Sequence, residues 1–222
     1  MPSCIVPRGC CADKTSPPEG LSMTVGVGGS RSRRLMGDRG VGLRALRSAA
    51  ERYAARGWPV LPGPVCDGLT AWHPLTCAPL GSREPTVPSS EATVDRRVIA
   101  QWWSGQRQAI LALVGPRFAV LRTPVSIGEQ VLAAFDGGRP LGPVALWPHG
   151  AWFFVEPGFR VNDGLALAPG VEVVPPGDVV CLPPSRVVSG VVRWRVSPME
   201  RDALGDSTAI LAKVAELSLE SA

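Results

Sequence analysis

The most regular hydrophobic pattern in the chain begins at Leu43. In the segment LRALRSAAERYAARG, apolar residues recur every three or four positions up to Tyr53, which is the spacing of an amphipathic helix. Gly57 is suited to end this helix, because glycine adopts the left-handed conformation without strain. The apolar run Trp58–Leu61 then predicts a short strand directly after the helix.

The segment 62–91 shows no comparable pattern. It is rich in proline and glycine and predicts a loop of about 30 residues, a length that is usually functional or mobile in a compact domain. Within it, Cys66, His73 and Cys77 could supply three ligands to a zinc ion, but a fourth ligand is missing. Free thiols and a surface histidine are therefore the expected state of these residues.

A second helix is predicted after Thr93, which is placed to cap it. Asp95 lies in the first turn, and the helix should run to about Trp103. Ile99, Trp102 and Trp103 would form its buried face. Stacking of the two tryptophans on nucleobases is the alternative to this packing role.

The remaining apolar runs indicate a third helix and a series of short strands. The helix spans Ser126–Phe135 and is closed by Asp136–Gly138. Val144–Trp147 and Trp152–Val155 should form a hairpin around Pro148-His149-Gly150. Gly170–Val174 and Asp178–Leu182 should pair around Pro175-Pro176-Gly177. The predicted strands are Ala109–Val114, Phe118–Leu121, Val144–Trp147, Trp152–Val155, Gly170–Val174, Asp178–Leu182 and Val191–Val196.

Pro183-Pro184-Ser185 lies between the last two of these runs. Two consecutive prolines fix φ and remove two backbone donors, so this loop is stiff and cannot continue a ladder. A stiff polar loop between strands is suited to present a binding group from a rigid sheet. A hairpin corner without a ligand is the alternative interpretation.

The chain ends in a segment, Met199–Leu219, that is mostly helical in pattern, interrupted at Gly205 and restarted at Asp206 or Ser207. The order of helices and strands predicts an α+β fold. We expect a disordered tail over residues 1–40, one domain over residues 41–198 and a C-terminal helical extension over residues 199–222. Met1, Met23 and Met36 all remain open as the starting residue.

The composition excludes several classes of protein. Hydrophobic residues make up 45% of the chain, which is enough for a core, and no uncharged apolar run reaches the roughly 18 residues of a membrane span. The N-terminus lacks the pattern of a secretory signal, so the cytoplasm is the expected location. Six of the 23 basic residues and three of the 19 acidic residues lie in residues 1–40, so residues 41–222 are almost neutral. This near-neutral charge argues against strong nonspecific binding of nucleic acid.

Four segments occur in an order and spacing that resemble a known family. They are AAERYAARGWPVLP, ATVDRRVIAQWW, the apolar run that ends at Gly115, and VVCLPPSRVVSGVVRW. Together they resemble the N-terminal primase/polymerase (prim-pol) domain of the archaeo-eukaryotic primase superfamily, over about residues 43–197. The resemblance implies a prim-pol-like fold, with a mixed sheet and flanking helices, and a role connected with DNA replication.

The resemblance also implies a polymerase-type site in which two acidic residues, one position apart on a strand, hold Mg²⁺ or Mn²⁺. Here the matching strand is VLRTP, and Arg122 and Pro124 stand at the two acidic positions. Neither can bind a metal ion, because arginine is a permanent cation and proline has no side-chain ligand. The family histidine falls near Ala151, with His149 two residues earlier, and the third acidic position matches Glu172.

The first hypothesis is therefore a degenerate prim-pol domain that is retained as a nucleotide-binding, nucleic-acid-binding or regulatory module. Its candidate binding residues are Arg122, His149, Ser185 and Arg186, and the expected partners are a nucleotide, single-stranded DNA or a replication protein. No metal and no cofactor are expected in this case. The second hypothesis is an active primase/polymerase that uses Mg²⁺ or Mn²⁺, and the third is a protein-interaction module without a nucleotide site.

Overall fold

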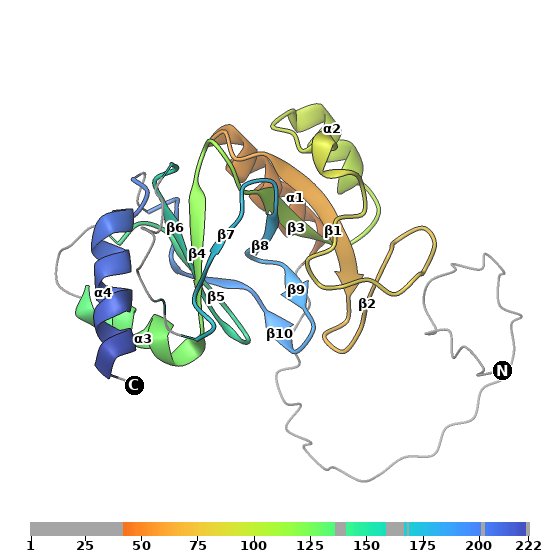
Figure 1. The fold of residues 1–222 in the computed structure, drawn as a ribbon. Helices are drawn as coiled ribbons and strands as arrows, with labels where there is room; N and C mark the ends of the chain where they lie inside the picture. The colour runs from red at the N-terminus through yellow and green to blue at the C-terminus, as the bar shows by residue number, and fades with distance from the viewer. Residues whose placement is uncertain (1–41, 136–140, 159–166, 168, 201–202, 221–222) are drawn as a thin grey trace, which may run out of the picture. The chain divides into compact units, whose positions relative to one another are not determined.

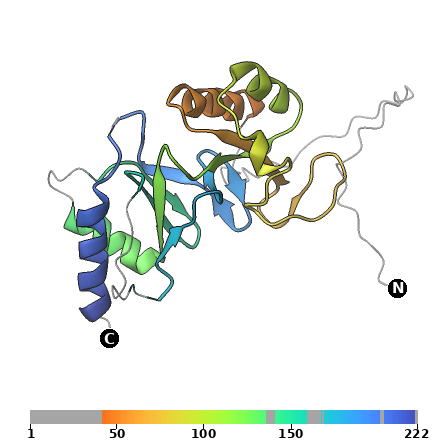
Figure 2. The same cartoon turned by 45° about the horizontal axis from the view of Figure 1, so that its top comes forward.

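The computed structural model describes residues 42–135, 141–158, 167, 169–200 and 203–220. Figures 1 and 2 show the helices in two groups, α1 with α2 beside β1 and β3, and α3 with α4 beside β4 and β6. The predicted tail and the predicted helix end at Asp136–Gly138 lie outside the described residues. The helices are α1 (Leu43–Ala55), the 3-10 helix η1 (Ser89–Glu91), α2 (Arg96–Trp102), α3 (Val125–Ala134) and α4 (Ser207–Glu220).

The strands form a four-stranded sheet in the order β2-β1-β3-β8, a five-stranded sheet in the order β11-β5-β6-β4-β7, and a two-stranded ladder of β9 and β10. Neighbouring strands in all three are antiparallel. The α+β class predicted from the sequence is confirmed. The strands are β1 (Val60–Cys66), β2 (Ala71–Trp72), β3 (Gln108–Leu113), β4 (Ala119–Thr123), β5 (Val144–Trp147), β6 (Gly150–Val155), β7 (Glu172–Val174), β8 (Val179–Leu182), β9 (Arg186–Val187), β10 (Gly190–Val191) and β11 (Arg193–Val196).

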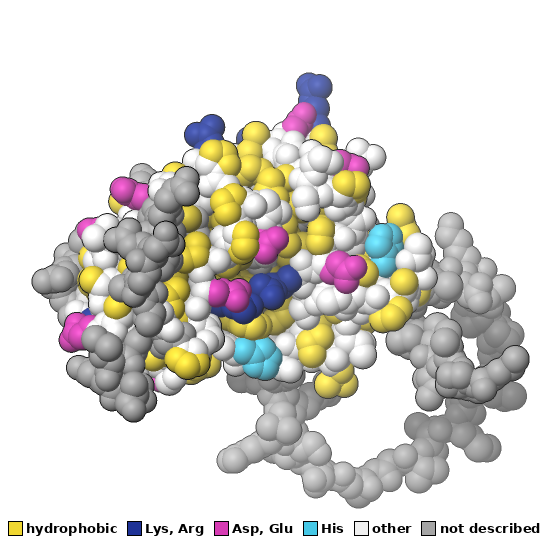
Figure 3. Space-filling model, in the orientation of Figure 1, with side chains coloured by type: hydrophobic (Ala, Val, Ile, Leu, Met, Phe, Trp, Pro, Cys, Tyr) yellow, Lys and Arg dark blue, Asp and Glu magenta, His cyan; other side chains and the backbone are white. Residues whose placement is uncertain are grey.

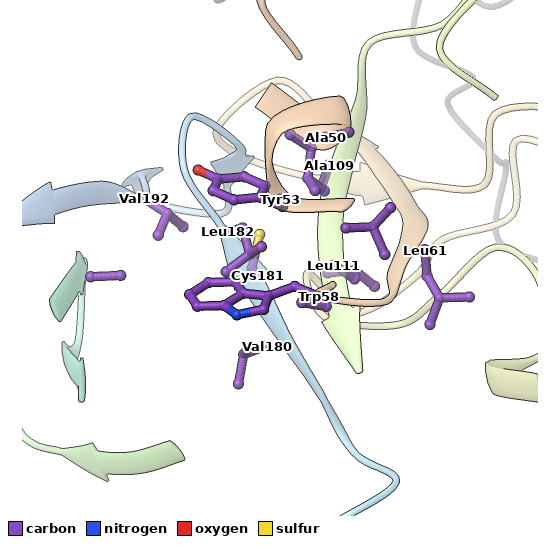
Figure 4. Close-up of a cluster of buried hydrophobic side chains, with 14 of the residues drawn as sticks. Ala50, Tyr53, Trp58, Leu61, Ala109, Leu111, Val180, Cys181, Leu182 and Val192 are labelled. Atoms are coloured by element: carbon purple, nitrogen blue, oxygen red, sulfur yellow. The ribbon is translucent and has the colours of Figure 1, made fainter. Parts of the chain in front are cut away.

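The larger core joins the two main sheets. Trp58 lies at its centre, 5% exposed, just before β1, and it stacks on Phe154 of β6 with ring centroids 5.1 Å apart. Figure 4 shows the ring of Tyr53, from α1, lying over Trp58 beside Cys181 of β8. Helix α1 can deliver Tyr53 here because Gly57, with φ +77°, ends the helix as predicted and turns the chain back into β1.

The smaller core lies on the other face of the five-stranded sheet. Leu121 of β4 and Phe153 of β6 pack there against α3 and α4. Helix α4 is capped by Asp206, whose carboxylate accepts hydrogen bonds from the backbone N–H groups of Thr208 and Ala209. The predicted restart at Asp206 or Ser207 is thus confirmed.

The prediction of one continuous loop over residues 62–91 is wrong. Strand β1 continues to Cys66, and Pro62 of β1 lies opposite Ile110 of β3 in spite of having no N–H. The ladder shifts register between Pro62 and Val65, an irregularity of the kind at which proline is tolerated within a sheet. Strand β2 and the helix η1 add two short elements to the same segment.

The second helix differs from its prediction in two details. Its capping residue is Asp95, whose carboxylate accepts the N–H of Arg97 at 2.7 Å, whereas the Thr93 hydroxyl accepts the N–H of Asp95. Ile99 and Trp103 are fully buried, as predicted. Trp102 is only half-buried, because it lies in the last turn and packs at the edge of the core.

The predicted pairing of Gly170–Val174 with Asp178–Leu182 is wrong. Strand β7 pairs with β4 in the five-stranded sheet, and β8 pairs with β3 in the four-stranded sheet. The turn itself closes, because the Pro175 carbonyl accepts the N–H of Asp178 at 3.1 Å, but Pro175 and Pro176 have no N–H to donate to a ladder between the two strands. This turn instead carries the chain from one sheet to the other.

The Pro183-Pro184-Ser185 loop has a similar role. Strand β8 enters it from the four-stranded sheet, and β11 later joins β5 in the five-stranded sheet, so the loop is not the corner of a hairpin between these two strands. Between them, β9 and β10 form a small hairpin of their own. The hairpin predicted for β5 and β6 is confirmed.

Candidate functional site

Arg122 lies near the end of β4, which runs between β6 and β7 in the five-stranded sheet. It stands directly opposite Trp152 of β6 and directly opposite Glu172 of β7. Opposite residues of antiparallel strands project to the same face of a sheet. The three side chains therefore form one row across the sheet, on the face that carries the larger core.

Arg122 and Glu172 form an ion pair. Nη2 of Arg122 is 2.5 Å from Oε2 of Glu172, and the two side chains are 24% and 45% exposed. The guanidinium has five N–H donors, and this contact joins one of its nitrogens to one carboxylate oxygen. Figure 3 shows basic and acidic side chains next to each other near the middle of the surface in view.

His149 lies on the turn between β5 and β6 and is exposed. Its ring meets Trp147 edge to face, with ring centroids 5.1 Å apart. Trp147 in turn stacks on Trp152 at 5.4 Å, with 12° between the ring planes. A row of rings thus leads from His149 to Trp152, the cross-strand neighbour of Arg122.

Ser185 and Arg186, the two candidates on the proline loop, make contacts within the protein. Ser185 is fully buried, and its hydroxyl accepts the N–H of Ile110 in β3 at 2.7 Å. Arg186 donates from Nη1 to the backbone carbonyl of Asp67 at 2.6 Å. Both contacts attach the loop to the four-stranded sheet.

Tyr53 holds the start of this loop. Its hydroxyl donates to the carbonyl of Pro183 at 2.6 Å and accepts the indole N–H of Trp194 at 2.8 Å. Burial raises the pKa of the Tyr53 phenol well above its ordinary value. One neutral hydroxyl therefore connects α1, the proline loop and β11.

Residues 50–212 match the family model described as bifunctional DNA primase/polymerase, N-terminal. The chain belongs to this family. The match covers most of the chain and includes every element from β1 to β11. No curated protein and no solved structure matches the chain. No helix in the described part of this prim-pol chain is long and apolar enough to cross a membrane.

The residues of this prim-pol domain do not fit the Mg²⁺ or Mn²⁺ site that the family resemblance implies. Glu172 is the one carboxylate at the three acidic positions, and it is engaged by Arg122. Pro124 is the capping residue of α3 and offers no side-chain ligand. Among the described residues, no group of three or more His, Cys, Asp or Glu side chains could hold a metal ion.

Ala151 lies on the opposite face of the sheet from Arg122. It pairs with Thr123 and belongs to the smaller core, where Gly128 of α3 packs against both residues. The β6 residue that shares the face of Arg122 is Trp152. A histidine acting beside Arg122 would therefore have to stand at position 152, one residue later than the position inferred from the sequence.

Cys66, His73 and Cys77 do not form a metal site in the described part of the chain. Nδ1 of His73 accepts the N–H groups of Leu75 and Thr76 at 3.2 and 3.3 Å. Burial raises the pKa of the Cys66 thiol, which opposes the thiolate that zinc requires. His73 therefore organises its own turn.

Proposed function

We propose that this prim-pol domain binds a nucleotide or single-stranded nucleic acid on the Arg122 face of its five-stranded sheet and does not catalyse nucleotidyl transfer. The observation that supports this proposal is the ion pair of Arg122 with Glu172 at the positions where the family resemblance expects metal ligands. A guanidinium is a permanent cation whose planar donors match the oxygens of a phosphate. Arg122 thus offers to a phosphate the positive charge that metal ions offer in a polymerase.

The same residue opposes a metal ion. Even a single positive charge at about 4 Å from Arg122 would be repelled by roughly 4 kcal/mol at an effective dielectric constant near 20, and a divalent ion by more. A phosphate is attracted to the guanidinium and competes with the Glu172 carboxylate for it. We therefore expect binding that does not depend on divalent metal.

The experiment is a titration of the full chain against a fluorescently labelled oligo(dT) and against a labelled ATP analogue, followed by anisotropy at low ionic strength. Binding should be equal in EDTA and in Mg²⁺, and Arg122→Ala should weaken it roughly ten-fold, because a charge-assisted hydrogen-bond donor is lost. The matched control is Arg193→Ala. Arg193 is exposed on β11 of the same sheet, and the adjacent Trp194 packs into the larger core, so Arg193 projects to the other face.

Binding that requires Mg²⁺, or that Arg122→Ala leaves unchanged, would contradict the proposal. A primer-extension assay with Mg²⁺ or Mn²⁺ tests the catalytic part separately. No template-dependent product is expected. Extension above the level of a reaction without the protein would identify an active primase/polymerase.

A further inference from the structure

A cavity of about 410 Å³ lies between the loop 81–84, the β5–β6 turn and strand β9. Its size falls within the range of small-molecule sites in proteins. Arg122 and Glu172 do not line it. The lining residues are Gly81, Ser82, Arg83, Glu84, Trp147, His149, Trp152, Val187 and Val188.

Two indole N–H groups at this cavity have no acceptor. Nε1 of Trp147 and Nε1 of Trp152 are both buried, and neither has a hydrogen-bond partner in the described structure. Trp152 is fully buried. Buried N–H groups are nearly always paired, and an indole can only donate. Neither nitrogen has accessible surface, so these residues offer a ligand in the cavity their apolar ring surface and not their N–H groups.

The cavity is lined by one cation, Arg83, and one anion, Glu84, which differ in their partners within the described structure. Arg83 is half-buried and forms no ion pair with any described residue. The carboxylate of Glu84 is turned to its own loop, where Oε2 accepts the N–H of Gly81 at 3.0 Å. His149 adds a ring that can donate a hydrogen bond. Arg83 is thus a cation without a carboxylate partner among the described residues, and it can pair with the oxyanion of a ligand.

The rest of the wall is apolar and is held in place. It includes Val187, Val188 and the stacked rings of Trp147 and Trp152. The hydroxyl of Ser82 accepts the N–H of Val188 at 3.2 Å and so ties the loop to the strand. An apolar wall with a few donors is typical of a site for a small organic molecule.

We infer that this cavity binds a small organic anion, with an apolar body against the tryptophans and valines and a phosphate or carboxylate group on Arg83. The cavity lies beside Arg122 on the same face of the five-stranded sheet, but Arg122 does not line it, and the inference rests on Arg83 and not on the function proposed above. Trp152 lies between the two, since it is opposite Arg122 in the sheet and also lines the cavity. The two sites can therefore be tested independently.

The experiment is calorimetric titration of the full chain with phenyl phosphate, benzoate and phenol. At least one of the two anions should bind with a single saturable site, and phenol, which lacks the anionic group, should bind at least roughly ten-fold more weakly. Arg83→Gln should weaken binding of that anion by a similar factor, and Arg193→Gln should not change it. Thermal unfolding of Arg83→Gln should match that of the wild type, because Arg83 makes no described ion pair.

Two further variants locate the bound anion. Trp147→Leu reduces the apolar wall of the cavity, so it should weaken the anion several-fold. Arg122→Gln removes the cation of the other proposed site, so binding that persists in Arg122→Gln and is lost in Arg83→Gln belongs to the cavity. The inference is overturned if neither anion binds saturably, if Arg83→Gln binds as the wild type does, or if Arg122→Gln abolishes binding and Arg83→Gln does not. The last result would assign the anion to the Arg122 face.

Discussion

Arg122 and Glu172 face each other directly across β4 and β7, with Nη2 and Oε2 2.5 Å apart. The cation that would repel a metal ion is thus held by the carboxylate that could have attracted one. Partly exposed ion pairs of this kind contribute only about 0–1 kcal/mol to stability. Their effect on which ligands can approach is larger than their effect on folding.

Removing the carboxylate should strengthen anion binding. Glu172→Gln keeps the size of the side chain and releases Arg122 from its partner, so affinity for labelled oligo(dT) should rise roughly three- to ten-fold, in line with a charged contact of about 1 kcal/mol. Anisotropy titration at low ionic strength measures the change. Weaker binding in Glu172→Gln would mean that the carboxylate itself contacts the ligand.

Reversing the charge should create affinity for metal. Arg122→Asp would place two carboxylates opposite each other, and their repulsion should destabilise the domain until a divalent cation binds. Mn²⁺ should then raise the Tm of Arg122→Asp, since a ligand at 100 times its Kd adds about 2.7 kcal/mol. The Tm of the wild type should not respond.

Arg193→Asp is the control for this change. Residue 193 stands opposite Leu146, so the variant gains a carboxylate without an acidic neighbour on the adjoining strand. Equal stabilisation of both variants by Mn²⁺ would show that the metal binds elsewhere.

The Tyr53 hydroxyl should be important for stability. Tyr53→Phe leaves the Pro183 carbonyl and the Trp194 N–H without their partner, and the cost should be at least about 2 kcal/mol, since each unsatisfied buried group costs about 1–3 kcal/mol. Trp194→Phe removes the donor N–H but leaves the Tyr53 bond to Pro183 in place. Urea denaturation should therefore separate the two hydrogen bonds of Tyr53. A loss below about 0.5 kcal/mol in Tyr53→Phe would contradict this role.

Alkaline pH should destabilise the domain through Cys181. Burial raises the pKa of this free thiol to about 12, whereas an unfolded cysteine ionises near pH 8.5. Because the folded pKa is the higher one, this stability is complete below about pH 8.5 and is lost as pH rises toward 12, by about 1.4 kcal/mol per pH unit. Urea unfolding at about pH 8, 9 and 10 measures the slope, which should be shallower in Cys181→Ala. Parallel slopes in the two proteins would refute the assignment.

Local patterns in the sequence predicted the elements well where one face of an element is buried. The helical period from Leu43 to Tyr53 corresponds to α1, and Gly57 ends it in the left-handed conformation. The β5–β6 hairpin is also local. The pairing of β7 with β4 and of β8 with β3 is not, because two neighbouring strands joined by a short turn resemble a hairpin whichever sheet they enter.

The candidate site was predictable only in part. The resemblance singled out Arg122 and Glu172, but their adjacency follows from the register of β7 on β4. Whether Ala151 or Trp152 stands at the position of the family histidine depends on a shift of one residue. Such a shift moves a side chain to the other face of a strand. The sequence does not single out Arg83 as a binding residue, because it lies in a proline-rich loop without a motif. Its lack of a carboxylate partner among the described residues depends on the tertiary structure.

The stacking of Trp58 on Phe154 makes the two main sheets one cooperative unit. Trp58 precedes the first strand of one sheet and Phe154 belongs to the other, so neither sheet can unfold without exposing an aromatic ring that the other requires. Far-UV circular dichroism and tryptophan fluorescence should therefore report a single, coincident unfolding transition. A ligand held by the five-stranded sheet alone would then protect α1 and the four-stranded sheet from unfolding to the same extent.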